Sequence, residues 1–187
     1  DGARLSHGGR GATETGPTDA VERRSLRVGW GSVRGPYSVY PVAITTAVAA
    51  RQLLTGPLIG LNSTGQFLPG AAVHWEQTSD GLSVVIEIRK GAMFNAHPCL
   101  PNGRSREATS ADLAYSIELR NQQTALFKPG FGPTEIIDDY RARVTFIRPS
   151  PFPEAMLASV FLVPKELAGE CDDPQNLAQP VGTGPFR

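Results

Sequence analysis

The alternation of residues 82–88 constrains the fold of this chain more than any other feature. Apolar side chains occupy every second position, at Leu82, Val84, Ile86 and Ile88. Successive side chains of a β-strand point to opposite faces, so the pattern predicts a strand with one buried face. Ser79-Asp80-Gly81 predicts a turn before it, with Trp75–Gln77 as the other arm of a hairpin. We therefore expect a β-sheet that covers a core.

Glycine and proline punctuate the rest of the chain. The 187 residues include 20 glycines and 16 prolines, nearly a fifth of the sequence, whereas the two usually make up roughly 12%. This excludes a bundle of long helices. One helix is predicted from Thr109 to about Asn121, because Thr109 and Asp112 have the spacing of a capping box. Its buried face would consist of Leu113, Ala114 and Ile117. Strands combined with helices indicate an α/β or α+β domain.

Several shorter elements are predicted from local patterns. Val144 and Phe146 alternate in a strand that follows a turn at Asp138-Asp139. Pro153 suits the first turn of a short helix, Glu154–Ala158. The other predicted elements are a strand at Leu26–Trp30, a helix at Val42–Leu54, a turn at Asn62–Gly65, turn-rich loops at Asn95–Glu107 and Phe127–Pro133, and a buried strand-like run at Val160–Val163.

The N-terminal stretch differs in composition from the rest. Residues 1–24 are polar and glycine-rich, which predicts a flexible tail or linker, and residues 25–187 are expected to form the folded domain. The chain carries 18 basic and 18 acidic residues. This balance argues against binding to nucleic acid or to an anionic membrane surface. No apolar run approaches the roughly 20 residues that span a bilayer.

No catalytic or cofactor motif is visible. The nucleophile elbow and the Walker A loop are both missing from the sequence. The Gly182-Thr183-Gly184 stretch is interpreted as a turn, and the paired carboxylates Asp138 and Asp139 as a solvated turn. His97-Pro98-Cys99 lacks a second ligand pair at the spacing of a zinc site. We therefore expect no enzyme activity, no cofactor and no metal.

Two features of the sequence each allow two interpretations. Cys99 and Cys171 could form one disulfide in an oxidising compartment or remain two free thiols. Trp30, Tyr37 and Tyr40 lie in or beside a loop that also holds Ser32 and Arg34. The loop could form one wall of a ligand cleft, or its aromatic residues could pack into the core.

The order and spacing of several segments resemble the N-terminal part of the family 5 extracellular solute-binding proteins. These are the oligopeptide- and dipeptide-binding receptors of ABC importers. The similarity extends over about residues 25–187. It is carried by Leu26–Gly29, Leu53–Leu58, Leu68–Glu76, Ser79–Leu82, Ile88–Phe94, Thr109–Ser116, Ile137–Tyr140, Val163–Lys165 and Pro180–Phe186.

This resemblance implies a type II periplasmic-binding-protein fold. The chain would hold the N-terminal lobe, with a mixed sheet and a subdomain, and would be incomplete because family members are longer and two-lobed. The implied function is that of the substrate-binding component of an ABC importer, which binds peptides or similar small solutes between two lobes. The implied protein is extracytoplasmic, periplasmic or anchored as a lipoprotein, and acts as a monomer with ABC permease subunits. An alternative is a ligand-sensing module of a signalling or regulatory protein.

The resemblance also suggests which residues serve binding. Ser32, Val33, Arg34 and Tyr37 would line the cleft at the end of the first strand. Arg34 could pair with a ligand carboxylate or could be an ordinary surface arginine. Thr183 and Gly184 would lie next to the hinge between the lobes, because glycine tolerates the backbone angles that such a crossing needs.

Overall fold

The computed structural model describes residues 55–122, 130–168 and 181–184. All of them belong to the larger of the two units into which the chain divides, residues 33–187. The predicted strand at Leu26–Trp30, the predicted helix at Val42–Leu54 and the boundary after residue 24 lie outside the described residues. None of the helices in the described ranges is long and apolar enough to cross a membrane.

The largest feature is a four-stranded sheet with the order β3-β4-β6-β5. Its strands are β3 (Ala72–Gln77), β4 (Ser83–Ile88), β5 (Phe131–Ile136) and β6 (Arg141–Phe146). Every neighbouring pair is antiparallel. Trp75 pairs with Ile86, which confirms the predicted hairpin arm, and Ile86 pairs with Ala142 on its other side. The turn between β3 and β4 has Gly81 at φ +70°.

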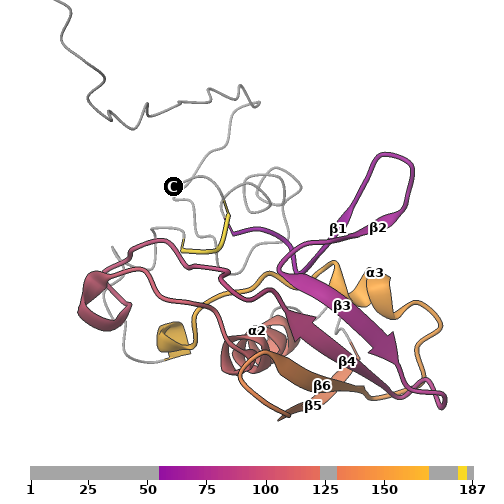
Figure 1. The fold of residues 1–187 in the computed structure, drawn as a ribbon. Helices are drawn as coiled ribbons and strands as arrows, with labels where there is room; N and C mark the ends of the chain where they lie inside the picture. Colours follow the sequence, from indigo (N-terminus) through magenta and orange to yellow (C-terminus); the bar gives the residue numbers. More distant parts are fainter. Residues whose placement is uncertain (1–54, 123–129, 169–180, 185–187) are drawn as a thin grey trace, which may run out of the picture. The chain divides into compact units, whose positions relative to one another are not determined.

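Alternating burial gives this sheet one apolar face. The fully buried positions are Ala72 of β3, Val84, Ile86 and Ile88 of β4, and Ala142 and Val144 of β6. Helix α2 (Ser110–Gln122) packs against β5 and β6, with Leu113 and Ile117 buried (Figure 1). Burying each such side chain stabilises the fold by about 1.5–3 kcal/mol. Ala114, expected on the buried face, is only partly buried, and the polar Asp112 and Ser116 are buried instead.

Strand β5 corrects one prediction. The sequence predicts a loop at Phe127–Pro133, whose residues 127–129 lie outside the described residues, but β5 begins at Phe131 and includes Pro133. Two conditions allow a proline there. β5 is an edge strand, so the missing N–H is needed by no further strand, and the pairing is irregular between Phe131 and Thr134. Local composition cannot reveal which strand of a sheet will be at the edge.

A two-stranded hairpin extends from the main sheet (Figure 1). It consists of β1 (Ile59–Leu61) and β2 (Phe67–Pro69). The predicted turn between them is confirmed, because Asn62 Oδ1 accepts hydrogen bonds from the N–H groups of Thr64 and Gln66. Directly after β2, the backbone of Gly70 passes close to Pro57. A Cβ at residue 70 would lie 2.2 Å from the Pro57 carbonyl oxygen.

The last described elements are short. Helix α3 (Pro153–Leu157) begins at the predicted proline. The structure corrects a second prediction, that of a buried strand-like run at Val160–Val163. Its residues other than Phe161 are buried as expected, but the run forms no strand and makes one isolated bridge, between Phe161 and Pro57. Two 3-10 turns complete the described structure, η1 (Pro101–Gly103) and η2 (Lys165–Ala168).

Candidate functional site

The residues predicted to touch a ligand fall into two groups. Ser32, Val33, Arg34 and Tyr37 lie outside the described residues, so their placement stays a prediction. Thr183 and Gly184 are described, within the segment 181–184, which is drawn in yellow in Figure 1. We call residues 181–184 the exit segment, because the resemblance puts it where the chain leaves the first lobe.

One side of the exit segment is held by Thr55. Both the N–H and the Oγ1–H of Thr183 donate to the Thr55 carbonyl, each at 3.1 Å. Thr55 itself is fully buried. A Cβ at Gly56, which has φ +68°, would lie 3.5 Å from Thr183 Oγ1. The exit segment thus lies directly against the backbone that precedes the β1-β2 hairpin.

The other side of the exit segment is held by Asn95. The Asn95 N–H donates to the Gly182 carbonyl at 3.0 Å, and its side-chain Nδ2 donates to the Gly184 carbonyl at 3.2 Å. Val181 is 1% exposed and is part of the main hydrophobic core. The exit segment is therefore anchored by core packing and by hydrogen bonds on two sides. Sequence patterns gave no signal for Asn95, because a single asparagine in a loop is unremarkable.

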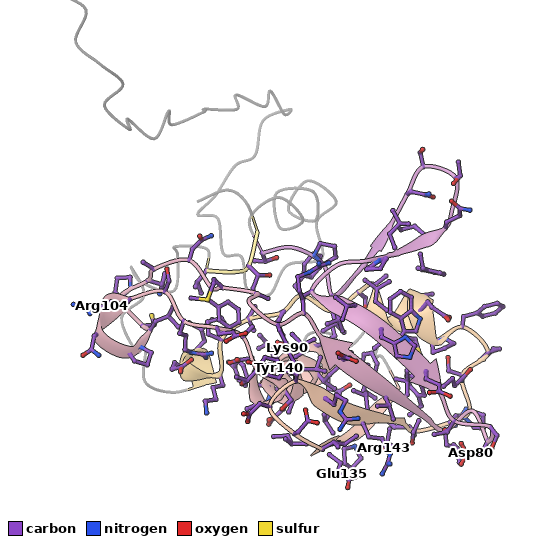
Figure 2. All side chains as sticks on the ribbon, viewed as in Figure 1. Asp80, Lys90, Arg104, Glu135, Tyr140 and Arg143 are labelled. Carbon is purple, nitrogen blue, oxygen red and sulfur yellow. The ribbon has the colours of Figure 1, made fainter. Side chains whose placement is uncertain are left out.

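Asn95 begins the long loop that ends at Glu107, and the two ends of this loop are paired. Phe94 N–H donates to the Arg106 carbonyl at 2.8 Å, and Ala108 N–H donates to the Ala92 carbonyl at 2.7 Å. The Phe94 side chain is fully buried. The loop therefore starts from a fixed base, while Arg104 lies exposed at its far end (Figure 2).

Arg106 fixes this base through two carboxylates. Its Nη1 and Nη2 donate to Asp112 at 2.9 and 2.6 Å, and its Nε and Nη2 donate to Glu166, at 3.0 Å for Nε. Nη1 also donates to the Glu107 carbonyl at 2.9 Å. All three guanidinium nitrogens are thereby used, and the group stacks 5.1 Å from the centre of the Phe94 ring. The ion-pair cluster joins the loop base, the start of α2 and η2.

The electrostatics of this cluster follow from its burial. Burial tends to raise the pKa of Asp112, but the hydrogen bonds from Arg106, Lys165 N–H and Thr109 N–H outweigh it and lower the pKa below its usual 3.8. Asp112 also raises the pKa of Arg106, so both groups are charged at neutral pH. The bond from Thr109 N–H to Asp112 Oδ2, at 2.8 Å, confirms the predicted capping-box start of α2.

The structure decides whether Cys99 is a free thiol or part of a disulfide. Cys99 is joined in a disulfide bond, and no free cysteine is present in the described ranges. Its N–H donates to Nδ1 of His97 at 3.2 Å, and His97 is 4% exposed. The chain contains one other cysteine, Cys171, which lies outside the described residues.

A surface hollow of about 410 Å³ lies beside the turn between β5 and β6. Its lining residues are Glu87, Lys90, Asp138, Asp139, Tyr140 and Arg141. Lys90 Nζ lies 5.2 Å from the centre of the Tyr140 ring (Figure 2). Asp138 accepts hydrogen bonds from the N–H groups of Tyr140 and Arg141 and pairs with the Arg141 side chain at 2.7 Å. This confirms the turn interpretation of the paired carboxylates.

Metal-ion chemistry has no support in the described residues. Across residues 55–122, 130–168 and 181–184, no group of three or more His, Cys, Asp or Glu side chains could hold a metal ion. His74 is exposed on β3. The hydrogen bonds of Thr55 and Asn95 hold the exit segment in place.

Comparison with known proteins relates this fold to a functional class. Neither a protein-family model nor a curated protein sequence matches the chain. Solved structures do match. The periplasmic binding protein DppA from Helicobacter pylori, in complex with the peptide STSA, is 21% identical with a TM-score of 0.64. The match covers 80% of this chain and 33% of DppA.

Two further structures agree. The dipeptide-binding protein from Pseudoalteromonas sp. SM9913, in complex with Met-Leu, is 21% identical with a TM-score of 0.65, over 80% of this chain and 34% of that protein. The periplasmic binding protein AgaA from A. tumefaciens, in complex with agropinic acid, is 26% identical with a TM-score of 0.62. That match covers 76% of this chain and 28% of AgaA.

The chain has the fold of part of a periplasmic solute-binding protein. It spans about a third of the length of these binding proteins, which agrees with the expected incomplete lobe. The described structure supplies the antiparallel sheet and its covering helix. The matched proteins are binding proteins rather than enzymes.

Proposed function

We propose that this chain is one wall of a solute receptor that serves an ABC importer and binds peptides or similar small solutes between two lobes. The observation that carries the proposal is the agreement of the fold with three solute-binding proteins, each in complex with a small solute. Two of those solutes are peptides, STSA and Met-Leu. No particular observation favours a sensing role over transport.

The proposed mechanism is closure without chemistry. Two lobes rotate about a hinge and enclose the solute, and the closed form is recognised by permease subunits. A peptide is held by hydrogen bonds to its backbone, as in strand addition, while its side chains occupy roomy pockets. Because every peptide shares the same backbone, this arrangement gives broad specificity. The protein acts as a monomer without cofactor, and catalysis is no part of this function.

The proposed location is extracytoplasmic. The matched proteins are periplasmic binding proteins by description, and the disulfide at Cys99 supports an oxidising compartment. Disulfides persist in the periplasm and outside the cell, whereas cytosolic reductants keep thiols reduced. Within that compartment, we propose that the protein is either free in the periplasm or anchored to a membrane as a lipoprotein.

Calorimetric titration tests the proposal. The complete gene product and the 187-residue chain are each titrated with a mixed library of di- to hexapeptides. We expect saturable binding by a two-lobed product and none by a single lobe, because a single lobe offers only half of the contacts. A folded two-lobed product that binds no peptide would contradict the peptide assignment.

The proposed cleft residues have a sharper test. We propose that Ser32, Val33, Arg34 and Tyr37 line the cleft and that Arg34 pairs with the ligand carboxylate. Arg34→Gln should then weaken binding of a peptide with a free C-terminus by roughly tenfold or more, and leave binding of the same peptide with an amidated C-terminus unchanged. Equal loss for both peptides would contradict the carboxylate pairing.

A further inference from the structure

The exit segment is held in a way that points to a specific role for Asn95. We propose that Asn95 is a positioning residue that fixes residues 181–184 to this lobe. The exit segment then moves with the lobe as one body, and the pivot of lobe closure lies outside residues 181–184. This inference rests on the proposed function only where it concerns closure.

The hydrogen bonds of the exit segment alternate between two partners. Thr183 donates twice to Thr55, while the carbonyls of Gly182 and Gly184, on either side of Thr183, accept from Asn95. A neighbouring β-strand would donate to these two carbonyls from two backbone N–H groups. Asn95 donates to one from its backbone N–H and to the other from its side chain. Each of these three consecutive residues is hydrogen-bonded to one of the two partners, so none of them is left unrestrained to act as a pivot.

Asn95 is itself rigidly placed. It follows the fully buried Phe94, whose backbone pairs with Arg106 at the base of the loop. Arg106 is in turn bound to Asp112 and Glu166. Because these contacts fix the backbone next to Asn95, only the Asn95 side chain has to be ordered when it binds the exit segment, which lowers the cost of that hydrogen bond.

The amide of Thr183 offers a direct reporter of this anchor. Its N–H is bonded to Thr55 and makes no bond to Asn95, so its hydrogen exchange measures docking of the whole segment rather than loss of one bond. In the 187-residue chain, Asn95→Ala should speed exchange at Thr183 by about 2- to 10-fold, the effect of one lost net hydrogen bond. Exchange at Ile86 in the sheet should remain unchanged.

A matched control is available in Asn121. Its Nδ2 also donates to a backbone carbonyl, that of Phe131, at 3.1 Å, but this bond joins α2 to β5 and not to the exit segment. Asn121→Ala should leave Thr183 exchange as in the wild type. Asn95→Asp removes the same donor with almost no change of volume and places a carboxylate oxygen against the Gly184 carbonyl, so it should speed Thr183 exchange at least as much as Asn95→Ala. Unchanged Thr183 exchange in both Asn95 variants, or equal acceleration at Ile86, would overturn the proposal.

A second measurement extends the test to closure. In the two-lobed gene product, Asn95→Ala should raise the Kd for a bound peptide by a similar 2- to 10-fold, because the exit segment must first be ordered before the lobes close. Asn121→Ala should not change the Kd. An unchanged Kd in Asn95→Ala would overturn the role in closure. If the wild-type product binds no peptide, the proposed function fails, while the exchange result still decides whether Asn95 anchors the segment.

Discussion

Arg106 and Asp112 face each other in a two-bond ion pair, with Nη1–Oδ2 and Nη2–Oδ1 separations of 2.9 and 2.6 Å. The Asp112 side chain is fully buried and the Arg106 side chain is 21% exposed. Because the same guanidinium also binds Glu166, this pair connects the loop base to α2 and η2. The stability of the loop base, and with it the position of Asn95, depends on this planar fork.

Replacing Arg106 with lysine tests the need for the fork. Arg106→Lys keeps the positive charge but cannot form two parallel hydrogen bonds with each carboxylate, so we expect a loss of about 1–3 kcal/mol in the free energy of unfolding. Urea denaturation measures the change. The control is Arg143→Lys, whose partner Glu135 lies across an exposed strand pair (Figure 2). That change should cost less than about 1 kcal/mol, and equal losses would contradict the prediction.

The lowered pKa of Asp112 predicts how the free energy of unfolding depends on pH. Its pKa is lowered in the folded protein, so its contribution is fully present above the unfolded value of 3.8 and is lost as pH falls through the lower folded value. Asp112→Asn should reduce stability at pH 7 by about 3 kcal/mol, because Arg106 loses its buried partner, and should flatten the decline below pH 4. Unfolding followed by circular dichroism between pH 7 and pH 2 measures both effects.

Asp80 provides the comparison for that experiment. Its pKa is also lowered, first by the Thr78 hydroxyl and then by the Leu82 N–H, but the group is fully exposed. Solvent screens its interactions, so Asp80→Asn should change the acid dependence less than Asp112→Asn does. If the two variants showed the same acid profile, burial of Asp112 would not be the cause.

Gly70 is predicted to accept no side chain. Ala71 N–H and Ala72 N–H bond to the carbonyls of Pro57 and Leu58 at 3.0 and 2.9 Å, which draws the two backbones together. An added Cβ would lie 2.2 Å from the Pro57 oxygen, so Gly70→Ala should lower the free energy of unfolding by about 1–3 kcal/mol or more. At Gly60 the nearest atom would lie at 3.6 Å, and thermal unfolding of Gly60→Ala should show a much smaller loss.

The disulfide at Cys99 predicts a specific cross-link. Cys171 is the only other cysteine of the sequence, so mass spectrometry of a non-reduced digest should find one peptide pair joined through Cys99 and Cys171. The bond would close a long loop of chain, and its reduction should lower the melting temperature. A separate Cys99→Ser/Cys171→Ser variant should melt like the reduced protein. Recovery of both cysteines as free thiols from an unreduced sample would contradict the prediction.

Sequence patterns were informative where the cause of structure is local. The alternation at Val84 and Ile86 gave β4, and the Thr109 and Asp112 spacing gave the start of α2. Pro153 gave the start of α3. In each case a short-range rule of side-chain direction or capping is enough, because the residues that matter are within one turn or one strand.

The sequence by itself determined the strand and helix signals of this chain and its likeness to one class of binding protein. Tertiary structure decided the rest. β5 contains Pro133 because it is an edge strand, Val160–Val163 is buried without pairing into a strand, and Asn95 meets Gly184 from 89 positions away. These outcomes depend on which distant backbone groups remain to be paired once the core has formed, and no local pattern contains that information.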